Sequence, residues 1–174
     1  MEKVIQVLNQ MQADGVIEKY AIGGGIAAIY YLEAYQTDDL DVFVLPVAVR
    51  DSGLISLESI YGYLEHLGYH SVDEGIGVLI EDWPVQFLFA CESIQEEAVT
   101  LADDVPFGQS HTKIFSAEHL AAELLRSGRD KDLIRVKKLY QSEDFEAVFF
   151  QELISRHNLS QKWTEFVSRY GLEA

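Results

Sequence analysis

The first 35 residues alternate between long apolar stripes and short breaks. Apolar residues recur at helical spacing over residues 2–18, which predicts an amphipathic helix. Residues 20–22 are typical of a short strand, and the three glycines Gly23 to Gly25 interrupt regular structure. Residues 26–35 are rich in alanine and aromatic side chains and predict a buried helix. The order is therefore helix, strand, glycine turn, helix.

Strands and helices share the middle of the chain, and helical periodicity alone fills its end. Residues 39–45 begin with polar alternation and end as an apolar run, which predicts a largely buried strand. The further predicted elements are a helix over 57–67, strands over 69–72, 77–81 and 85–90, and helices over 94–101, 117–126, 130–140, 145–157 and 161–170. The fold class is α+β. We expect an α/β core over residues 1–115 and a helical C-terminal extension over 116–174 that packs on the core without an independent domain boundary.

Composition narrows the class of protein. With 174 residues and 48% hydrophobic content, the chain is long enough for one well-buried core. A formal net charge of −16 opposes extended binding to nucleic acid and to anionic membrane surfaces. The N-terminus lacks a secretory pattern and no apolar stretch reaches membrane-spanning length, so we expect a cytoplasmic protein with no membrane association. The single cysteine, Cys91, follows an apolar run and predicts a buried structural thiol.

The glycine turn and the next strand hold the residues that point to chemistry. Three glycines between a strand and a helix let the backbone approach a polyphosphate closely, and a helix N-terminus offers unpaired N–H groups. Asp39 and Asp41 are two positions apart on a strand, so their carboxylates project from one face and can share Mg²⁺. The structural alternatives are a tight packing turn for the glycines and an acidic strand tip for the aspartates.

The segment that contains these residues, YAIGGGIAAIYYLEAYQTDDLDVFV, resembles the core motif of the nucleotidyltransferase-fold superfamily. Thr37 before the acidic pair is similar to the small toxin-type members of abortive-infection and toxin–antitoxin systems. The later segment HLAAELLRSGRDKDLIRVKKL is similar to their helical segment, with Arg129, Lys131 and Asp132 at the matching positions. The resemblance implies a mixed β-sheet with flanking helices.

The same resemblance implies a set of site residues. Gly23, Gly24, Gly25 and Thr37 would bind a nucleoside triphosphate, together with Arg129 and Lys131. Asp39 and Asp41 would hold two Mg²⁺ ions. A third acidic residue on a neighbouring strand helps to activate the attacking hydroxyl in this superfamily.

Two positions depart from the pattern of the superfamily. Gln86 occupies the place of the third acid, and an amide cannot accept a proton at neutral pH. Glu81, Asp82 and Glu74 are the candidate substitutes, with solvent-facing turn positions as the alternative. Glu123 stands where relatives often carry a lysine that reaches the phosphates.

Basic residues gather between Arg126 and Lys138. This stretch fits either a solvated helix face or a phosphate contact, and Arg126, Arg129 or Lys131 could balance the charge of Glu123. The five histidines show no metal-ligand spacing, so zinc is not expected.

Two functions remain open. The first is Mg²⁺-dependent transfer of a nucleoside monophosphate from an NTP to a hydroxyl of a protein, a small molecule or an RNA 3′ end. The second is a catalytically degenerate module that binds a nucleotide or a partner protein.

Overall fold

The computed structural model describes residues 1–32, 36–45, 57–71 and 77–172, and the strands in this part form one mixed sheet. In chain order the elements are α1 (Glu2–Ala13), β1 (Lys19–Ile22), α2 (Gly24–Tyr31), β2 (Leu40–Leu45), α3 (Glu58–His66), β3 (Val78–Ile80), β4 (Trp83–Phe89), α4 (Ser93–Thr100), β5 (Asp103–Phe107), β6 (Ser110–Ile114), α5 (Ala117–Ser127), α6 (Asp130–Tyr140), α7 (Ala147–Arg156) and α8 (Ser160–Tyr170). The predicted α+β class and mixed sheet are confirmed.

The strand order β3-β4-β2-β1-β6-β5 puts the glycine turn and the acidic strand at the centre of the sheet. β1 runs antiparallel to β2 and parallel to β6, and β2 runs parallel to β4. The outer pairs, β3 with β4 and β5 with β6, are antiparallel hairpins. The turn that follows β1 therefore lies beside the start of β2, where the two aspartates are.

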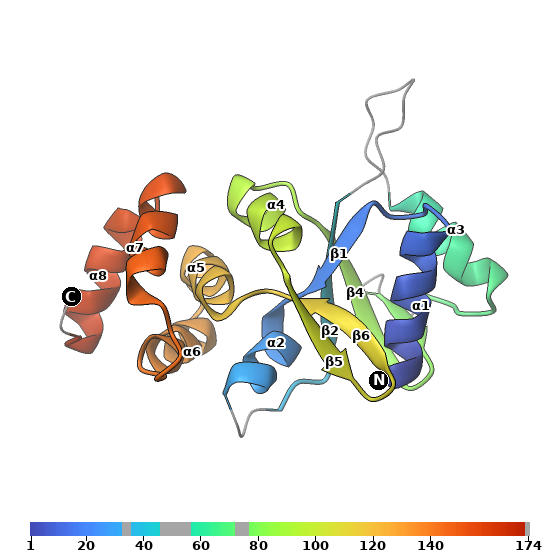
Figure 1. Ribbon diagram of the computed structural model, residues 1–174, viewed down its shortest axis with the longest axis horizontal. Coiled ribbons are helices and arrows are strands. Elements are labelled where there is room, and N and C mark those ends of the chain that lie inside the picture. Colours follow the sequence, from blue (N-terminus) through green and yellow to red (C-terminus); the bar gives the residue numbers. More distant parts are fainter. Residues whose placement is uncertain (33–35, 46–56, 72–76, 173–174) are drawn as a thin grey trace.

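Helices lie on both sides of the strands (Figure 1). In this view α1 and α3 lie to the right of the sheet and α5 to α8 gather to the left, with α2 and α4 between the sheet and α5. α2 contacts both β2 and α5, and α4 contacts β1, β2 and α5. These two helices join the sheet to the helical C-terminal part, and the first residues of α2 reach the point where sheet and helices meet.

Apolar burial explains why these elements pack as they do. Tyr20 on β1 is 1% exposed, and its hydroxyl is hydrogen-bonded to Asn9 at 2.7 Å and to Thr112 at 3.1 Å, which ties α1 and β6 to β1. Aromatic rings fill the helical part: Trp163 lies 5.0 Å from Phe150 between ring centroids. Such close ring pairs add to the free energy gained from burial alone.

The hairpin β5–β6 is an element that the apolar pattern does not predict. On β5 the side chains are exposed except for Val105, and on β6 the buried residues are Thr112 and Ile114. Pro106 lies on this edge strand, where a missing N–H costs no ladder hydrogen bond within the sheet. The alternation that marks a half-buried strand is therefore weak in this segment.

Several predicted boundaries were wrong. α1 ends at Ala13 rather than residue 18, and the predicted strand over 69–72 is represented in the described residues by a single bridge from Ser71 to Val78. The β3–β4 turn is shorter than expected, because Trp83 already belongs to β4. The predicted burial of Cys91 was also wrong, since this thiol is exposed just beyond β4.

Candidate functional site

Gly24 begins α2 in a conformation that other residues rarely adopt. Its φ is +54°, in the left-handed region, and a Cβ built on it would lie 1.8 Å from Oδ2 of Asp41. The backbone N–H of Gly25 lies near enough to the same carboxylate to lower its pKa. The prediction that the glycines exclude regular structure was wrong, because positive φ at Gly24 lets the helix start one residue after Gly23. The turn thus fits the Asp41 side chain against the start of α2.

The other two glycines of the turn have different neighbours. A Cβ on Gly25 would lie 2.4 Å from Oγ1 of Thr37. A Cβ on Gly23 would lie 2.6 Å from the ring of Phe43. Gly25 therefore faces the predicted site, whereas Gly23 is required by core packing and makes no part of the cleft wall described below.

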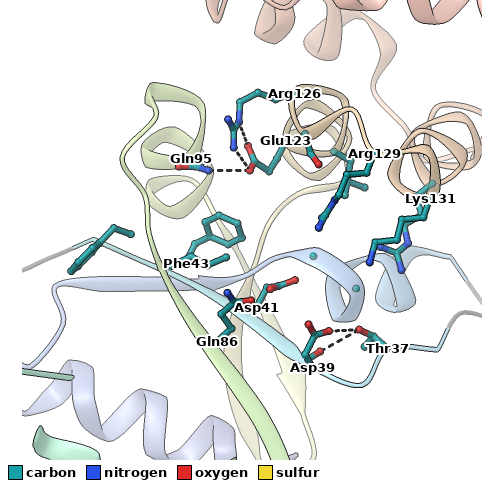
Figure 2. Close-up of a pocket in the computed structure, with 17 residues that line it drawn as sticks. Thr37, Asp39, Asp41, Phe43, Gln86, Gln95, Glu123, Arg126, Arg129 and Lys131 are labelled. Atoms are coloured by element: carbon teal, nitrogen blue, oxygen red, sulfur yellow. Dashed lines mark hydrogen bonds and ion pairs between the residues drawn. The ribbon is translucent and has the colours of Figure 1, made fainter. Parts of the chain in front are cut away.

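Asp39 and Asp41 lie side by side at the start of β2, as the alternation predicts. Oγ1 of Thr37 donates a hydrogen bond of 2.7 Å to Oδ1 of Asp39, which orients this carboxylate. Asp41 pairs in register with Gln86 on the parallel strand β4. Both side chains point into the same space (Figure 2).

Basic side chains face these carboxylates from α5 and α6 (Figure 2). Arg129 is the N-cap of α6, and Lys131 follows in its first turn. Behind them Asp132 is fully buried, and its Oδ2 accepts hydrogen bonds from Arg129 Nε at 2.5 Å and Ser127 Oγ at 2.9 Å. Its Oδ1 lies 3.3 Å from Nη1 of Arg135. This buried carboxylate therefore holds Arg129 and Arg135 in place, and these two residues with Lys131 form the basic wall of the site.

Glu123 does not present a free negative charge to the site. Its carboxylate accepts two hydrogen bonds from Arg126, at 2.7 and 2.9 Å, and a third from Gln95 Nε2 at 2.9 Å. Arg126 is thus the charge partner of Glu123, one of the three candidates that the sequence leaves open. The interaction joins α4 to α5 at the far end of the site.

These groups enclose a cleft of about 430 Å³ between the sheet and α5–α6. Its lining residues are Gly24, Gly25, Thr37, Asp39, Asp41, Phe43, Gln86, Leu88, Phe89, Gln95, Glu123, Leu124, Arg126, Ser127, Arg129, Lys131 and Arg135. Four of these are basic, out of 13 Lys and Arg residues in the chain. The basic stretch therefore supplies one wall of a cleft in this acidic protein, while Arg129 and Lys131 are also exposed to solvent.

The electrostatics of the cleft centre on Asp41. Burial raises the pKa of its carboxyl above the ordinary value, and the nearby Asp39 raises it further. Arg129, the N–H of Gly25 and Lys131 act in the opposite direction, but burial prevails. A positive charge at this position would relieve the cost of ionising Asp41.

The donor set fits one divalent cation. Mg²⁺ is commonly held by one or two carboxylates together with substrate phosphates, and Asp39 and Asp41 supply two carboxylates on one strand. No group of three or more His, Cys, Asp and Glu residues in the described ranges could hold a metal ion. The predicted pair of Mg²⁺ ions stays a prediction.

Two of the three candidate substitutes for the third acid do not line the cleft. Glu81 and Asp82 are exposed at the β3–β4 turn and are absent from the cleft wall. Glu74 lies outside the described residues. Gln95, Leu88 and Phe89 line the cleft although the sequence pattern did not single them out. Their apolar or amide character carries no local signal, because the fold alone brings them to the site.

Comparison with known proteins identifies the fold. No protein-family model matches the sequence, and no curated protein matches it as a relative. An antigenic nucleotidyltransferase-like protein from Paracoccidioides brasiliensis has a similar structure, with a TM-score of 0.58, 18% sequence identity, and coverage of 95% of this chain and 89% of that chain. The antibiotic-resistance factor ANT(2″)-Ia in solution gives a TM-score of 0.51 at 14% identity, with 96% of each chain covered.

The crystal structure of ANT(2″)-Ia in complex with adenylyl-2″-tobramycin gives a TM-score of 0.50 at 15% identity, covering 96% of this chain and 97% of that chain. At such low identity the likeness establishes the fold and no more. The chain has the nucleotidyltransferase fold that the glycine turn and Asp-x-Asp segment implied. The toxin-type subtype stays a hypothesis. In the described part, no helix is both long and apolar enough to cross a membrane.

Proposed function

We propose that this protein is a Mg²⁺-dependent nucleotidyltransferase that moves a nucleoside monophosphate from an NTP to a hydroxyl acceptor. The observation that carries the proposal is the cleft itself, in which Asp39 and Asp41 face Arg129 and Lys131. Carboxylates on one wall suit a divalent cation, and basic groups on the other suit the oxygens of a polyphosphate. The similar fold of ANT(2″)-Ia, whose structure holds an adenylylated antibiotic, supports the same kind of reaction.

Each group of residues in the cleft would have a separate role in such a reaction. The start of α2, at Gly24 and Gly25, offers backbone N–H groups and a positive dipole end to phosphate oxygens. Arg129 and Lys131 balance the negative charge of the leaving pyrophosphate. A bound Mg²⁺ would supply charge stabilisation and alignment of the phosphates, with Asp39 and Asp41 as its protein ligands. Catalysis would come from positioning and electrostatics more than from proton transfer.

A cation bound to Asp39 and Asp41 would lie beside the start of α2, where phosphate oxygens would bind. The positive charge of the cation would attract the phosphates, and the phosphates would complete the ligands of the cation. We therefore expect cation and nucleotide to bind cooperatively.

A thermal-shift titration tests the nucleotide site. ATP, GTP, CTP and UTP are each added with and without Mg²⁺, and the melting temperature is measured. We expect a metal-dependent increase that is lost in Asp41→Asn. Asp38→Asn is the matched control, because Asp38 is an exposed neighbour that does not line the cleft. An unchanged shift in Asp41→Asn would contradict the assignment.

Release of pyrophosphate from the bound NTP tests the reaction. A single observation favours the second candidate, a module that binds nucleotide without transfer: Gln86 stands in register with Asp41 where a proton acceptor is expected. Binding without pyrophosphate release, in the presence of protein, small-molecule and RNA acceptors, would select the module.

If the toxin-type subtype is correct, induced expression should arrest growth, and Asp41→Asn should relieve the arrest.

A further inference from the structure

We infer that the cleft holds a single divalent cation with its nucleotide, and that Gln86 is the residue that excludes a second. The inference rests on the proposed nucleotide site and specifies its metal content, in contrast to the pair of ions that the sequence resemblance implies. Three features support it: the neutral side chain of Gln86 beside Asp41, the hydrogen bonds that Glu123 already accepts, and the basic residues on the side of the cleft opposite the sheet.

Gln86, the residue that pairs with Asp41 between β2 and β4, is neutral. β2 and β4 pair in parallel register, so Asp41 and Gln86 are directly adjacent and both line the cleft. Figure 2 shows their side chains next to each other on the sheet side of the cleft. An amide oxygen is a weaker ligand than a carboxylate for a hard cation, because it carries no formal charge. A second cation beside Asp41 would share one carboxylate with the first and gain only this amide.

Glu123 is the remaining carboxylate in the cleft wall, and it is already in use. It is 9% exposed, and its two oxygens accept three hydrogen bonds from Arg126 and Gln95. A cation bound to Glu123 would have to break the paired hydrogen bonds from the guanidinium group. Such a cation would leave the Arg126 guanidinium, whose side chain is 34% exposed, without its carboxylate partner.

The opposite wall already provides positive charge. Arg129 and Lys131 line the same cleft as Asp41, on the side opposite the sheet (Figure 2). Arg135 lines the same cleft, whereas the charge of Arg126 is balanced by Glu123. A second divalent cation would therefore enter a space in which Arg129, Lys131 and Arg135 already provide positive charge for the phosphates. One cation, balanced by Asp39 and Asp41, satisfies the site.

The test counts bound Mn²⁺, a spectroscopic substitute for Mg²⁺, on the full chain. Protein and an α,β-methylene analogue of the best-binding NTP are mixed in equal amounts, and free Mn²⁺ is followed by electron paramagnetic resonance. We expect one Mn²⁺ per complex for the unaltered protein and two for Gln86→Glu, which has the shape of glutamine and adds one carboxylate. Gln86→Asp offers a second variant if Gln86→Glu does not fold.

Gln6→Glu is the matched control, because Gln6 is exposed on α1 and makes no part of the cleft. It makes the same chemical change and should leave the count at one. Two ions in the unaltered protein would overturn the inference and leave the proposed function standing. A count that stays at one in folded Gln86→Glu and Gln86→Asp, with nucleotide bound, would also overturn it. If no variant binds Mn²⁺ with nucleotide, the proposed function fails and the inference fails with it.

Discussion

Replacement of Gly24 by alanine is the most direct probe of how the turn shapes the cleft. The left-handed φ of +54° would cost roughly 1–2 kcal/mol with any L side chain. The new Cβ would also lie 1.8 Å from Oδ2 of Asp41, a separation that forces one of the two to move. Such overpacking typically costs about 1–3 kcal/mol. Together these effects predict a loss of roughly 2–5 kcal/mol of unfolding free energy.

The size of the chain converts this loss into a measurable shift. For domains of 150–250 residues, 1 kcal/mol corresponds to about 2–4 °C in melting temperature, so Gly24→Ala should melt roughly 4–20 °C lower than the unaltered protein. The Mg²⁺-dependent shift with NTP should disappear as well, because the methyl group displaces Asp41 and covers the start of α2. Both quantities come from the same thermal-shift experiment.

Gly15→Ala separates backbone strain from contact with Asp41. Gly15 has a φ of +73°, but a Cβ on it would meet no atom within 4 Å. This variant should lose only the unfolding free energy due to backbone strain, about 1–2 kcal/mol. Its melting temperature should still show the full increase with Mg²⁺ and NTP. If Gly24→Ala melts like Gly15→Ala and still responds to Mg²⁺ and NTP, then Asp41 is not held against α2 and the reasoning is refuted.

Three further predictions concern stability. Asp132→Asn should cost roughly 3–5 kcal/mol in urea unfolding because it removes the charge of a fully buried carboxylate that pairs with Arg129 and the mostly buried Arg135. Asp130→Asn, at an exposed pair, should cost less than about 1 kcal/mol. Burial lowers the pKa of the His119 imidazole below its ordinary 6.5, so the unfolded chain binds the imidazole proton more tightly than the folded protein does. The free energy of unfolding should have its full value above pH 6.5 and decrease as the pH falls below it. In His119→Asn this decrease should be less steep. Gly62→Ala, in α3 with no atom within 4 Å of the new Cβ, should raise the free energy of unfolding by about 0.5–1 kcal/mol.

The central part of the site could be predicted because its signals are local. A strand, a glycine turn, a helix and a strand with Asp39 and Asp41 occupy adjacent stretches of sequence, and alternation on a strand places the two carboxylates on one face. Gln86 was also placed correctly beside Asp41, as the strand register shows. These relations depend on neighbouring residues or on one strand pairing.

The rest of the cleft depends on contacts that are distant in sequence. Three basic residues were candidates to balance the charge of Glu123, and the structure pairs it with Arg126, three residues later on the same helix. That pairing has a recognisable i,i+3 spacing, but the third partner, Gln95, is 28 residues away and has no such signal. The burial of Asp132 likewise could not be predicted from the sequence, because the other residues of its segment are mostly charged. The proposed division into a core and a helical extension at residue 115 stays a prediction.

The net charge of −16 argued against extended binding to nucleic acid and to anionic membrane surfaces, and the cleft shows why a sum over the chain cannot decide a local site. At physiological salt, exposed charges further apart than about 8 Å are largely screened from one another. A ligand inside the cleft is therefore influenced mainly by Asp39, Asp41 and the basic wall, and only weakly by the acidic exterior. The exterior still opposes a long nucleic-acid strand, which must cover many surface positions at once. A protein with this charge distribution can favour a compact mononucleotide and disfavour a polynucleotide with the same phosphate chemistry.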